Sequence, residues 1–307
     1  MPLHAGVDIG GTNLRIGVVE DLRLVSVKRF HADFTHLCQN HAPEVAWRQI
    51  VAIVGNSLQQ VLQVYPDIAS IGIGFPGFID PVNGRILQAP NLPGIHDVDL
   101  AGDLAAYTHR PVVVENDAVA AAYGEFRLFR NTHHSLIYLG LGTGVGGGMV
   151  YADRPYLGQH GTAMEVGHVI VDHNDMARPC GCGNRGCLEQ YASASGVTLS
   201  YKLATGLELD AVTIADLARE GDSHAITAYA LAGSYLAQVV AHLAKILDIG
   251  QVVVGGGLSN AWDLMQPAFD RQLQADLIPV LRNNVYVRIS ASSDEAGMIG
   301  AALLSAL

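Results

Sequence analysis

The sequence is poor in charged residues, and the basic ones are the scarcer kind. Of its 307 residues 15% are charged, with 18 Lys and Arg against 29 Asp and Glu, which gives a formal net charge of −11. The basic residues are scattered along the chain rather than gathered in a stripe, which excludes a protein that binds nucleic acid through its phosphates. Low charge together with 50% hydrophobic residues is typical of a compact chain with little disorder.

Cysteine is scarce too, with four in the whole chain. Because three of them lie in one metal-like cluster, they give no disulfide framework, and they predict a reducing compartment, the cytoplasm. The N-terminus lacks the basic start and apolar run of a secretion signal, and a first strand is predicted from about residue 5. The stretch Ala225–Ala244 contains no Asp, Glu, Lys or Arg and is long enough to span a bilayer. Because it carries four polar side chains, we expect a buried core or subunit-interface helix and no contact with a membrane.

Three of the four cysteines lie in the segment Cys180-Gly-Cys182-Gly-Asn-Arg-Gly-Cys187, and His168 precedes them. Three thiols and an imidazole are ligands that tetrahedral zinc prefers, and glycines let the backbone fold tightly round an ion. We therefore predict a zinc site formed by His168, Cys180, Cys182 and Cys187. The alternative is a loop with free thiols. The pattern alone does not decide between a catalytic and a structural metal.

Glycine is abundant, with 34 residues, and it clusters at the ends of predicted strands. The turn Gly10-Gly11-Thr12-Asn13 joins two strands just after Asp8, and Gly142–Gly148, with Thr143, repeats this design. Backbone N–H groups in such turns can hold a phosphate, with Asp8 placed to hold Mg²⁺. The first turn alone could be an ordinary glycine hairpin, but two such turns half a chain apart indicate two related lobes, each with a phosphate clamp.

These glycine turns are not the common nucleotide-binding loops. Neither is followed by a helix and the first lacks Gly-Lys-Ser/Thr, which excludes a Walker loop and a Rossmann dinucleotide site. A third cluster, Gly255-Gly256-Gly257, follows a buried strand. Three consecutive glycines there would let a flat ligand such as a nucleoside base approach the backbone.

An apolar strand over residues 110–115 runs directly into Asn116-Asp117, and a helix is predicted from Ala118. We interpret Asp117, at the carboxyl end of a central strand, as a general base; the alternative is a helix cap. Gly77 follows the buried strand 70–75, at an edge where open α/β sheets bind ligands. Asn91 is held in a proline-rich loop, where its amide is available to a hydroxyl group.

Together these motifs resemble the ROK family (repressor, open reading frame, kinase) of sugar kinases in the actin/hexokinase superfamily. The resemblance covers essentially the whole chain and rests on Asp8–Asn13, Glu115–Asp117, Gly142–Gly148, Glu165–His168, Cys180–Glu189 and Val254–Gly257. It implies an α/β fold of two ribonuclease-H-like (actin-like ATPase) lobes, with the active site in the cleft between them and a structural zinc loop. The lobes would comprise residues 1–117 with 295–307, and residues 118–294, with the last helix packed back on the first lobe.

The resemblance also implies ATP-dependent phosphorylation of a hexose, usually at the 6-hydroxyl, with Mg²⁺ near Asp8 and Asp117 as the catalytic base. The implied sugar-binding residues are Gly77, Asn91, Asn116, Asp117, Glu165, His168 and Glu189. The implied ATP-binding residues are Asp8, Gly10, Gly11, Thr12, Asn13, Gly142, Thr143, Gly144, Gly255, Gly256 and Gly257. With four protein ligands, the zinc would have no open position and would be structural. Its role would be to hold the loop that carries Glu165 and Glu189.

Several alternatives stay open at this level. The segments Ala89–Gly94 and Glu115–Asp117 are closest to glucokinase-like members, but the sugar could be allose, fructose, N-acetylmannosamine or N-acetylglucosamine. A ROK repressor or a non-catalytic sugar sensor is disfavoured, because there is no room for a helix-turn-helix domain before the first strand and because Asp8, Asp117 and both glycine turns are present. The sequence departs from the family in two places. Val119 stands where many members have Asn, and the segment from Glu189 to Gly196 is longer than the usual one. We expect a homodimer or a tetramer.

Overall fold

The computed structural model describes residues 2–10, 13–129 and 133–307, and the chain forms two compact units. The first unit consists of Met1–His134, Gly148–Ala163 and Ser292–Leu307, and the second of Ser135–Gly147 and Met164–Ala291. The lobe boundaries expected from the family resemblance stay a prediction.

The first unit contains a five-stranded sheet with the order β3-β2-β1-β4-β8. Polar and apolar residues alternate over 23–30, which predicts a third strand after the first hairpin, and β1, β2 and β3 do form an antiparallel meander. Strands β4 and β8 continue the sheet in parallel. A small sheet of order β5-β6-β7 accompanies it. The strands are β1 (Leu3–Ile9), β2 (Asn13–Glu20), β3 (Arg23–His31), β4 (Ile68–Phe75), β5 (Phe78–Ile79), β6 (Ile86–Gln88), β7 (His96–Val98) and β8 (Val112–Asn116).

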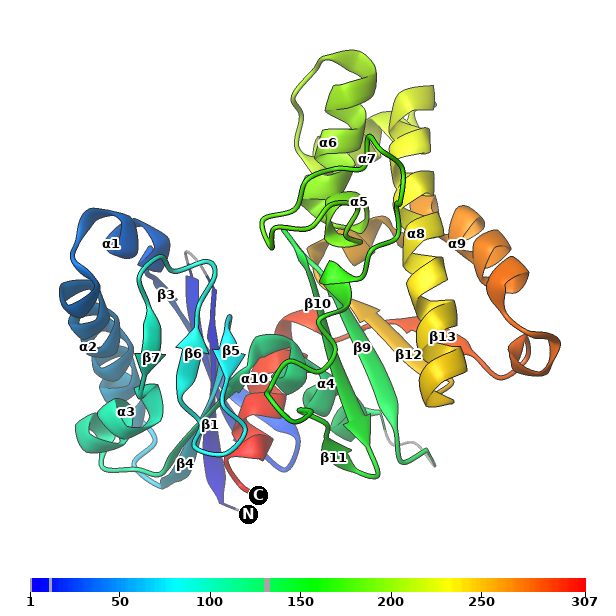
Figure 1. Ribbon diagram of the computed structural model, residues 1–307. Helices are drawn as coiled ribbons and strands as arrows, with labels where there is room; N and C mark the ends of the chain where they lie inside the picture. Colours follow the sequence, from blue (N-terminus) through cyan, green and yellow to red (C-terminus); the bar gives the residue numbers. More distant parts are fainter. Residues whose placement is uncertain (1, 11–12, 130–132) are drawn as a thin grey trace. The chain divides into compact units, whose positions relative to one another are not determined.

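Apolar periodicity explains how this unit is covered. In α2, buried Ile50, Val54, Leu58 and Val61 recur at helical spacing, so one stripe of the helix packs into the core. After Pro43, the exposed residues of the helix are charged or polar, namely Glu44, Arg48, Asn56 and Gln60. Figure 1 shows α2 with α1 and α3 beside the strands of this unit. The helices of the unit are α1 (Phe34–Asn40), α2 (Pro43–Leu62), α3 (Leu100–Thr108), α4 (Asp117–Leu128) and α10 (Ser293–Leu304).

The closing helix α10 lies directly against β1, β4 and α4. Glycines make this close approach possible. A Cβ at Gly6 would overlap the carbonyl oxygen of Met298, and one at Gly300 would overlap the carbonyl oxygen of Ala120. Helix α10 therefore packs within the first unit, and its buried residues are Ala296, Met298, Ile299, Ala301 and Ala302.

The second five-stranded sheet has the order β11-β10-β9-β12-β13. Both sheets arrange their five strands in the same way. If the strands of each sheet are counted along the chain, the order across the sheet is third, second, first, fourth and fifth, and the first, fourth and fifth run parallel. The predicted repetition of one design is therefore visible in the topology. The strands are β9 (Leu136–Leu141), β10 (Val145–Tyr151), β11 (Arg154–Pro155), β12 (Gln251–Gly255) and β13 (Tyr286–Ile289).

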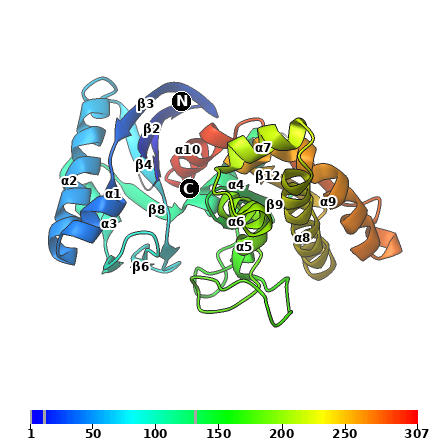
Figure 2. The ribbon, with the colours of Figure 1, turned by 90° about the horizontal axis from the view of Figure 1, so that it is seen from above.

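Helix α8 is the predicted long apolar helix, and its bounds are Ser223–Leu247. Among the described residues it is the one helix long and apolar enough to cross a membrane, a weak signal that core helices also give. It packs against α5, α6, α7 and α9, and Figure 2 shows it beside α9. The helices of this unit are α5 (Glu189–Ala192), α6 (Ala194–Thr205), α7 (Ala211–Arg219), α8 and α9 (Trp262–Asp276). The packing supports a core helix, as expected.

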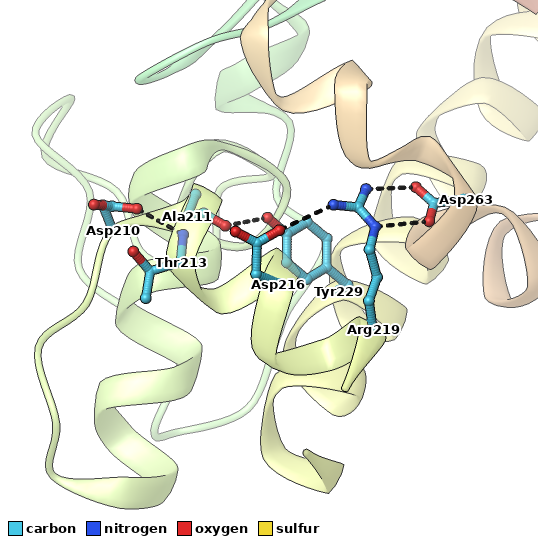
Figure 3. A network of polar contacts seen from close by, with 7 residues as sticks. All are labelled: Asp210, Ala211, Thr213, Asp216, Arg219, Tyr229 and Asp263. Carbon is cyan, nitrogen blue, oxygen red and sulfur yellow. Dashed lines mark hydrogen bonds and ion pairs between the residues drawn. The ribbon is translucent and has the colours of Figure 1, made fainter. Parts of the chain in front are cut away.

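Polar contacts fasten three of these helices to one another (Figure 3). Arg219 at the end of α7 donates from Nη2 and Nε to the two carboxylate oxygens of Asp263 in α9, at 3.0 and 3.2 Å. The hydroxyl of Tyr229 in α8 donates to the backbone oxygen of Ala211 at 2.6 Å, and burial raises the pKa of Tyr229 to about 12. Helices α7, α8 and α9 are thus joined by polar contacts at the surface as well as by packing in the core.

One expected helix differs from the structure. The pattern predicts a single helix over residues 188–203, but the chain forms α5 and α6 with a break at Ser193, which is extended (φ −98°, ψ 170°). The Ser193 hydroxyl donates to the Glu189 carbonyl at 2.6 Å and accepts from the Gly196 N–H at 2.9 Å. It therefore caps both helices, and its own burial is complete.

Candidate active site and metal centre

The first glycine turn is closed by a backbone bond from Gly10 N–H to the Asn13 carbonyl at 2.8 Å. The predicted ATP-binding residues Gly11 and Thr12 lie outside the described residues. Asp8, at the end of β1, is paired across the hairpin with Arg15, whose Nε donates to Asp8 Oδ2 at 2.9 Å. This ion pair is a feature that the sequence analysis missed. The register of β1 and β2 pairs Asp8 with Arg15, and the sequence alone does not fix that register.

Asn116 and Asp117 lie where β8 ends and α4 begins. Asn116 is the helix cap: its Oδ1 accepts from the N–H groups of Ala118 and Val119, at 2.9 and 3.2 Å. The cap alternative is thus correct for Asn116. Asp117 occupies the first helical position, where its Oδ1 accepts from Ala118 N–H at 2.8 Å. Its carboxylate therefore lies at the N-terminus of α4, directly after the end of β8.

Gly77 is brought to this strand end by the sheet. Phe75 is the register partner of Asn116, and the Asn116 Nδ2 donates to the Gly77 carbonyl at 3.1 Å. Asn91 is exposed, and its backbone oxygen accepts from Thr35 Oγ1 at 3.4 Å. Its loop borders a cavity of about 460 Å³ lined by residues 87–90 and 93–96. Of the sugar-binding residues predicted in the first unit, the structure therefore joins Gly77, Asn116 and Asp117 directly.

Glu115 is a buried carboxyl next to this pair that was not singled out as a functional residue. Its Oε1 accepts from Asn116 N–H at 2.8 Å. Burial raises the pKa of Glu115 to about 7, against the opposing effect of that hydrogen bond. A glutamate at the end of an apolar strand was the available signal, since the preceding residues Val112–Val114 predict burial.

We expect the buried carboxyl of Glu115 to make stability depend on pH. The native carboxyl keeps its proton up to a pH of about 7, whereas the ordinary value is 4.5, so the free energy of unfolding falls as pH rises between these values. The full penalty is on the order of 3 kcal/mol. Glu115→Gln keeps the acceptor oxygen and removes the charge, so it should gain stability over the wild type at pH 8 and little at pH 5. Urea denaturation at both pH values measures this.

The exposed glutamate at the end of α7 provides the control, because Glu220→Gln changes the charge equally without burial. Its stability difference from the wild type should be similar at pH 5 and pH 8. Parallel pH curves for the wild type and Glu115→Gln would show that the carboxyl is not held protonated.

The second glycine turn, between β9 and β10, is closed by a bond from Gly142 N–H to the Gly144 carbonyl at 3.0 Å. The carboxylate of Glu189 reaches this turn: its Oε2 accepts from Val145 N–H at 3.1 Å. A Cβ at Gly144 would overlap that carboxylate in its present position, so a larger residue there would displace the Glu189 side chain. Thr143 is exposed at the tip. The structure thus joins a predicted sugar-binding side chain to a predicted phosphate-binding turn, which no sequence pattern indicated.

The third glycine cluster follows β12. Gly256 has φ +83°, a left-handed conformation that favours glycine, and its carbonyl accepts from the Ser259 N–H and hydroxyl at 3.1 and 2.7 Å. Gly255 is buried at the strand end and Gly257 is exposed. A short 3₁₀ helix, Gly257–Ala261, comes before α9 rather than a helix from Asn260. The exposed backbone after β12 is therefore a tight, preformed turn.

The four predicted metal ligands meet in the second unit. One ligand atom from each of His168, Cys180, Cys182 and Cys187 lies within 4.8 Å of the others. Cys182 Sγ and Cys187 Sγ are 3.6 Å apart, and Cys180 Sγ is 3.7 Å from His168 Nδ1. Tetrahedral zinc with bonds of about 2.0–2.3 Å requires ligand separations of this size. The residues fit the ion, and the cluster is consistent with a zinc site.

The imidazole of His168 has its two nitrogens toward different groups. Nδ1 faces the cysteines, and Nε2 lies 4.0 Å from Glu165 Oε2. Partial burial raises the pKa of the Glu165 carboxyl. The nearby His168 opposes this shift, and the charge of Glu189 adds to it. Metal-bound histidines commonly place their second nitrogen on a carboxylate, which orients the ring. Glu165 is therefore close enough to both His168 and Glu189 to feel their charges.

Comparison with known proteins agrees with this geometry. The model of the ROK family matches residues 4–306. A glucokinase of Thermotoga maritima is 34% identical over 97% of this chain and 95% of its own, and an N-acetyl-D-glucosamine kinase of Salmonella typhimurium is 31% identical over 98% and 99%. A crystal structure of a ROK family glucokinase from Streptomyces griseus, in complex with glucose and AMPPNP, is 30% identical over 98% of both chains, with a TM-score of 0.81. The predicted α/β fold is confirmed, and the chain belongs to the ROK family.

Proposed function

We propose that the protein is an ATP-dependent sugar kinase that transfers the γ-phosphoryl group of ATP to a hexose, at the 6-hydroxyl of glucose or a glucose-like sugar. Family membership over residues 4–306 and the names of its relatives support the proposal. The structural observation that carries it is the position of Asp117. This carboxylate stands at the junction of β8 and α4, held by the capped helix start behind it.

The chemistry follows from these side chains. As the sugar oxygen bonds to the γ-phosphorus, the bond from phosphorus to the bridging oxygen breaks and ADP leaves; Asp117 accepts the hydroxyl proton. Asn116, Glu165 and Glu189, with His168, Gly77 and Asn91, would bind the other hydroxyl groups. The Asn116 side chain makes three hydrogen bonds to the protein, which hold its amide in one orientation beside Asp117 and Gly77.

The nucleotide would be bound by Asp8, the two glycine turns and Gly255–Gly257. Mg²⁺ bound with ATP would neutralise charge on the transferring phosphoryl group. Because Asp8 Oδ2 accepts from Arg15, its other oxygen is the one we expect to face the ion or a water bound to it. The zinc would be structural, since four protein ligands leave no open position for substrate.

A screen of ADP release over glucose, allose, fructose, mannose, N-acetylglucosamine and N-acetylmannosamine at a fixed ATP concentration tests the proposal. We expect sugar-dependent ADP release, highest with glucose. N-acetylglucosamine is the second candidate, because a relative of similar identity carries that name. Binding of sugar without ADP release from any of them would instead favour a sensor. A homodimer and a cytoplasmic location also stay proposals, and sedimentation would test the first.

A further inference from the structure

The metal-binding loop contains an arginine that has no part in the predicted site. Arg178 lies two residues before Cys180, and its guanidinium is partly buried. Nη1 donates to the carbonyl oxygens of Gln190 and Gly196, at 2.5 and 3.2 Å, and Nη2 donates to Ser200 Oγ at 2.9 Å. One side chain thus connects the metal loop to both α5 and α6.

The side chain of Tyr191 also holds this arginine, through its hydroxyl group and through the face of its ring. Its backbone N–H donates to the Tyr191 hydroxyl at 3.1 Å, and its guanidinium carbon lies 4.4 Å from the centre of the Tyr191 ring. The same hydroxyl donates to Asp172 Oδ2 at 2.6 Å. A planar guanidinium with a stacked ring and several fixed acceptors has one orientation, which a lysine could not reproduce.

The break at Ser193 leaves backbone carbonyls that need hydrogen-bond donors, and these contacts supply one. A helix that ends leaves its last carbonyls without intrahelical donors, and buried carbonyls without partners are costly. At the end of α5 the Glu189 carbonyl is satisfied by the Ser193 hydroxyl and the Gln190 carbonyl by Arg178. Arg178 therefore stabilises the broken form of this segment by bonding a carbonyl that the end of α5 leaves without a helical donor.

The broken segment in turn holds the second glycine turn at both ends. The N–H of Ala194, the first residue of α6, donates to the Gly142 carbonyl at 2.9 Å. At the other end, Val145 N–H donates to the carboxylate of Glu189, the first residue of α5. In a continuous helix the N–H of Ala194 would be directed to the carbonyl four residues earlier and would be lost to the turn.

We propose that Arg178 is a positioning residue, which fixes the α5–α6 junction and through it both the Glu189 carboxylate and the Gly142–Val145 turn. The metal ligands end at Cys187, and beyond them the Arg178 guanidinium bonds the loop to carbonyls on both sides of the junction, those of Gln190 and Gly196. This inference rests on the proposed function, in which Glu189 binds the sugar and the turn binds phosphate. It implies that one side chain remote from the reacting atoms sets the affinity for both substrates.

The kinetic test compares Arg178→Met with Arg178→Lys and with Arg185→Met. Methionine keeps an apolar stem and removes the donors, and Arg185 is an exposed arginine of the same loop. We expect Arg178→Met to raise KM for the sugar and for ATP by about tenfold each, the effect of losing one or two hydrogen bonds. Bound zinc should stay at the wild-type level. Arg178→Lys should fall between, and Arg185→Met should match the wild type. Unchanged KM values with a smaller active fraction would mean a merely structural role and would overturn the proposal.

Amide hydrogen exchange tests the same link without any activity. In Arg178→Met the N–H groups of Ala194 and Val145 should exchange about tenfold faster than in the wild type, while those of β12 stay unchanged. Unchanged exchange at both amides would overturn the proposal even if the protein proves to be a kinase. Conversely, faster exchange in a protein that phosphorylates no sugar would support the link from Arg178 to the glycine turn and would overturn only the proposed function. If Arg178→Met does not fold, the exchange rates of Arg178→Lys decide the question.

Discussion

Replacement of Asp117 by asparagine should lower turnover by about 10²–10⁴-fold and leave binding of sugar and nucleotide close to the wild-type level. The amide cannot accept the proton of the attacking hydroxyl group. Its oxygen can still accept from Ala118 N–H, as the carboxylate does at 2.8 Å, so the start of α4 should be preserved. Steady-state ADP release measures the turnover, and calorimetric titration with the sugar and with a non-hydrolysable ATP analogue measures the binding.

The matched control is Asp103→Asn. Asp103 also lies in the first turn of a helix of the first unit, and its carboxylate accepts from Trp47 Nε1 at 2.8 Å, a bond that an amide oxygen can keep. This variant should turn over at the wild-type rate. An Asp117→Asn enzyme within a few-fold of wild-type turnover would contradict the assignment of the general base. Loss of sugar binding together with turnover would mean that Asp117 serves chiefly to hold the sugar.

The sequence predicted those parts of the molecule that depend on local pattern. Alternating and helical periodicities indicate the meander and α2 because each buries one face, and three thiols within eight residues restrict the metal ligands to a short loop. Family motifs added the fold and the site residues. In contrast, the ion pair of Asp8 with Arg15 requires the register of a hairpin, which a glycine turn of unknown length does not fix.

Contacts between distant segments were out of reach for a physical reason. The bond from Val145 N–H to Glu189 joins residues 44 apart, and nothing in either segment specifies the other. The break at Ser193 was missed because the segment was interpreted as one continuous helix, although Ser193 and Gly196 are poor helix formers and serine is a preferred N-cap. Tertiary partners, the Gly142 carbonyl and Arg178, compensate there for the lost helical bonds. The sequence could therefore nominate Glu189 and the glycine turn, but not the fact that they form one hydrogen-bonded unit.

Loss of the metal is the second change for which a large effect is expected. Cys182→Ser should reduce bound zinc from one ion per chain to a small fraction and lower the thermal midpoint by on the order of 10 °C. Cys182 is the right ligand to change because it is exposed, whereas Cys180 and Cys187 are buried and their replacement would also disturb packing. Metal analysis of the purified protein and a thermal denaturation curve measure the two effects.

The fourth cysteine separates loss of the metal from loss of a thiol. Cys38 is buried in α1 of the first unit, so Cys38→Ser should cost some packing energy and leave the zinc content at one per chain. A strong chelator should lower the thermal midpoint of the wild type and of Cys38→Ser, but not that of Cys182→Ser, which has no ion left to lose. The metal loop carries Glu165 and Glu189 near its two ends, so the chelator should also weaken sugar binding. If the chelator changed neither the thermal midpoint nor the sugar affinity of the wild type, the result would contradict a structural metal. Arg178 and Ser193 would then be the main supports of this segment.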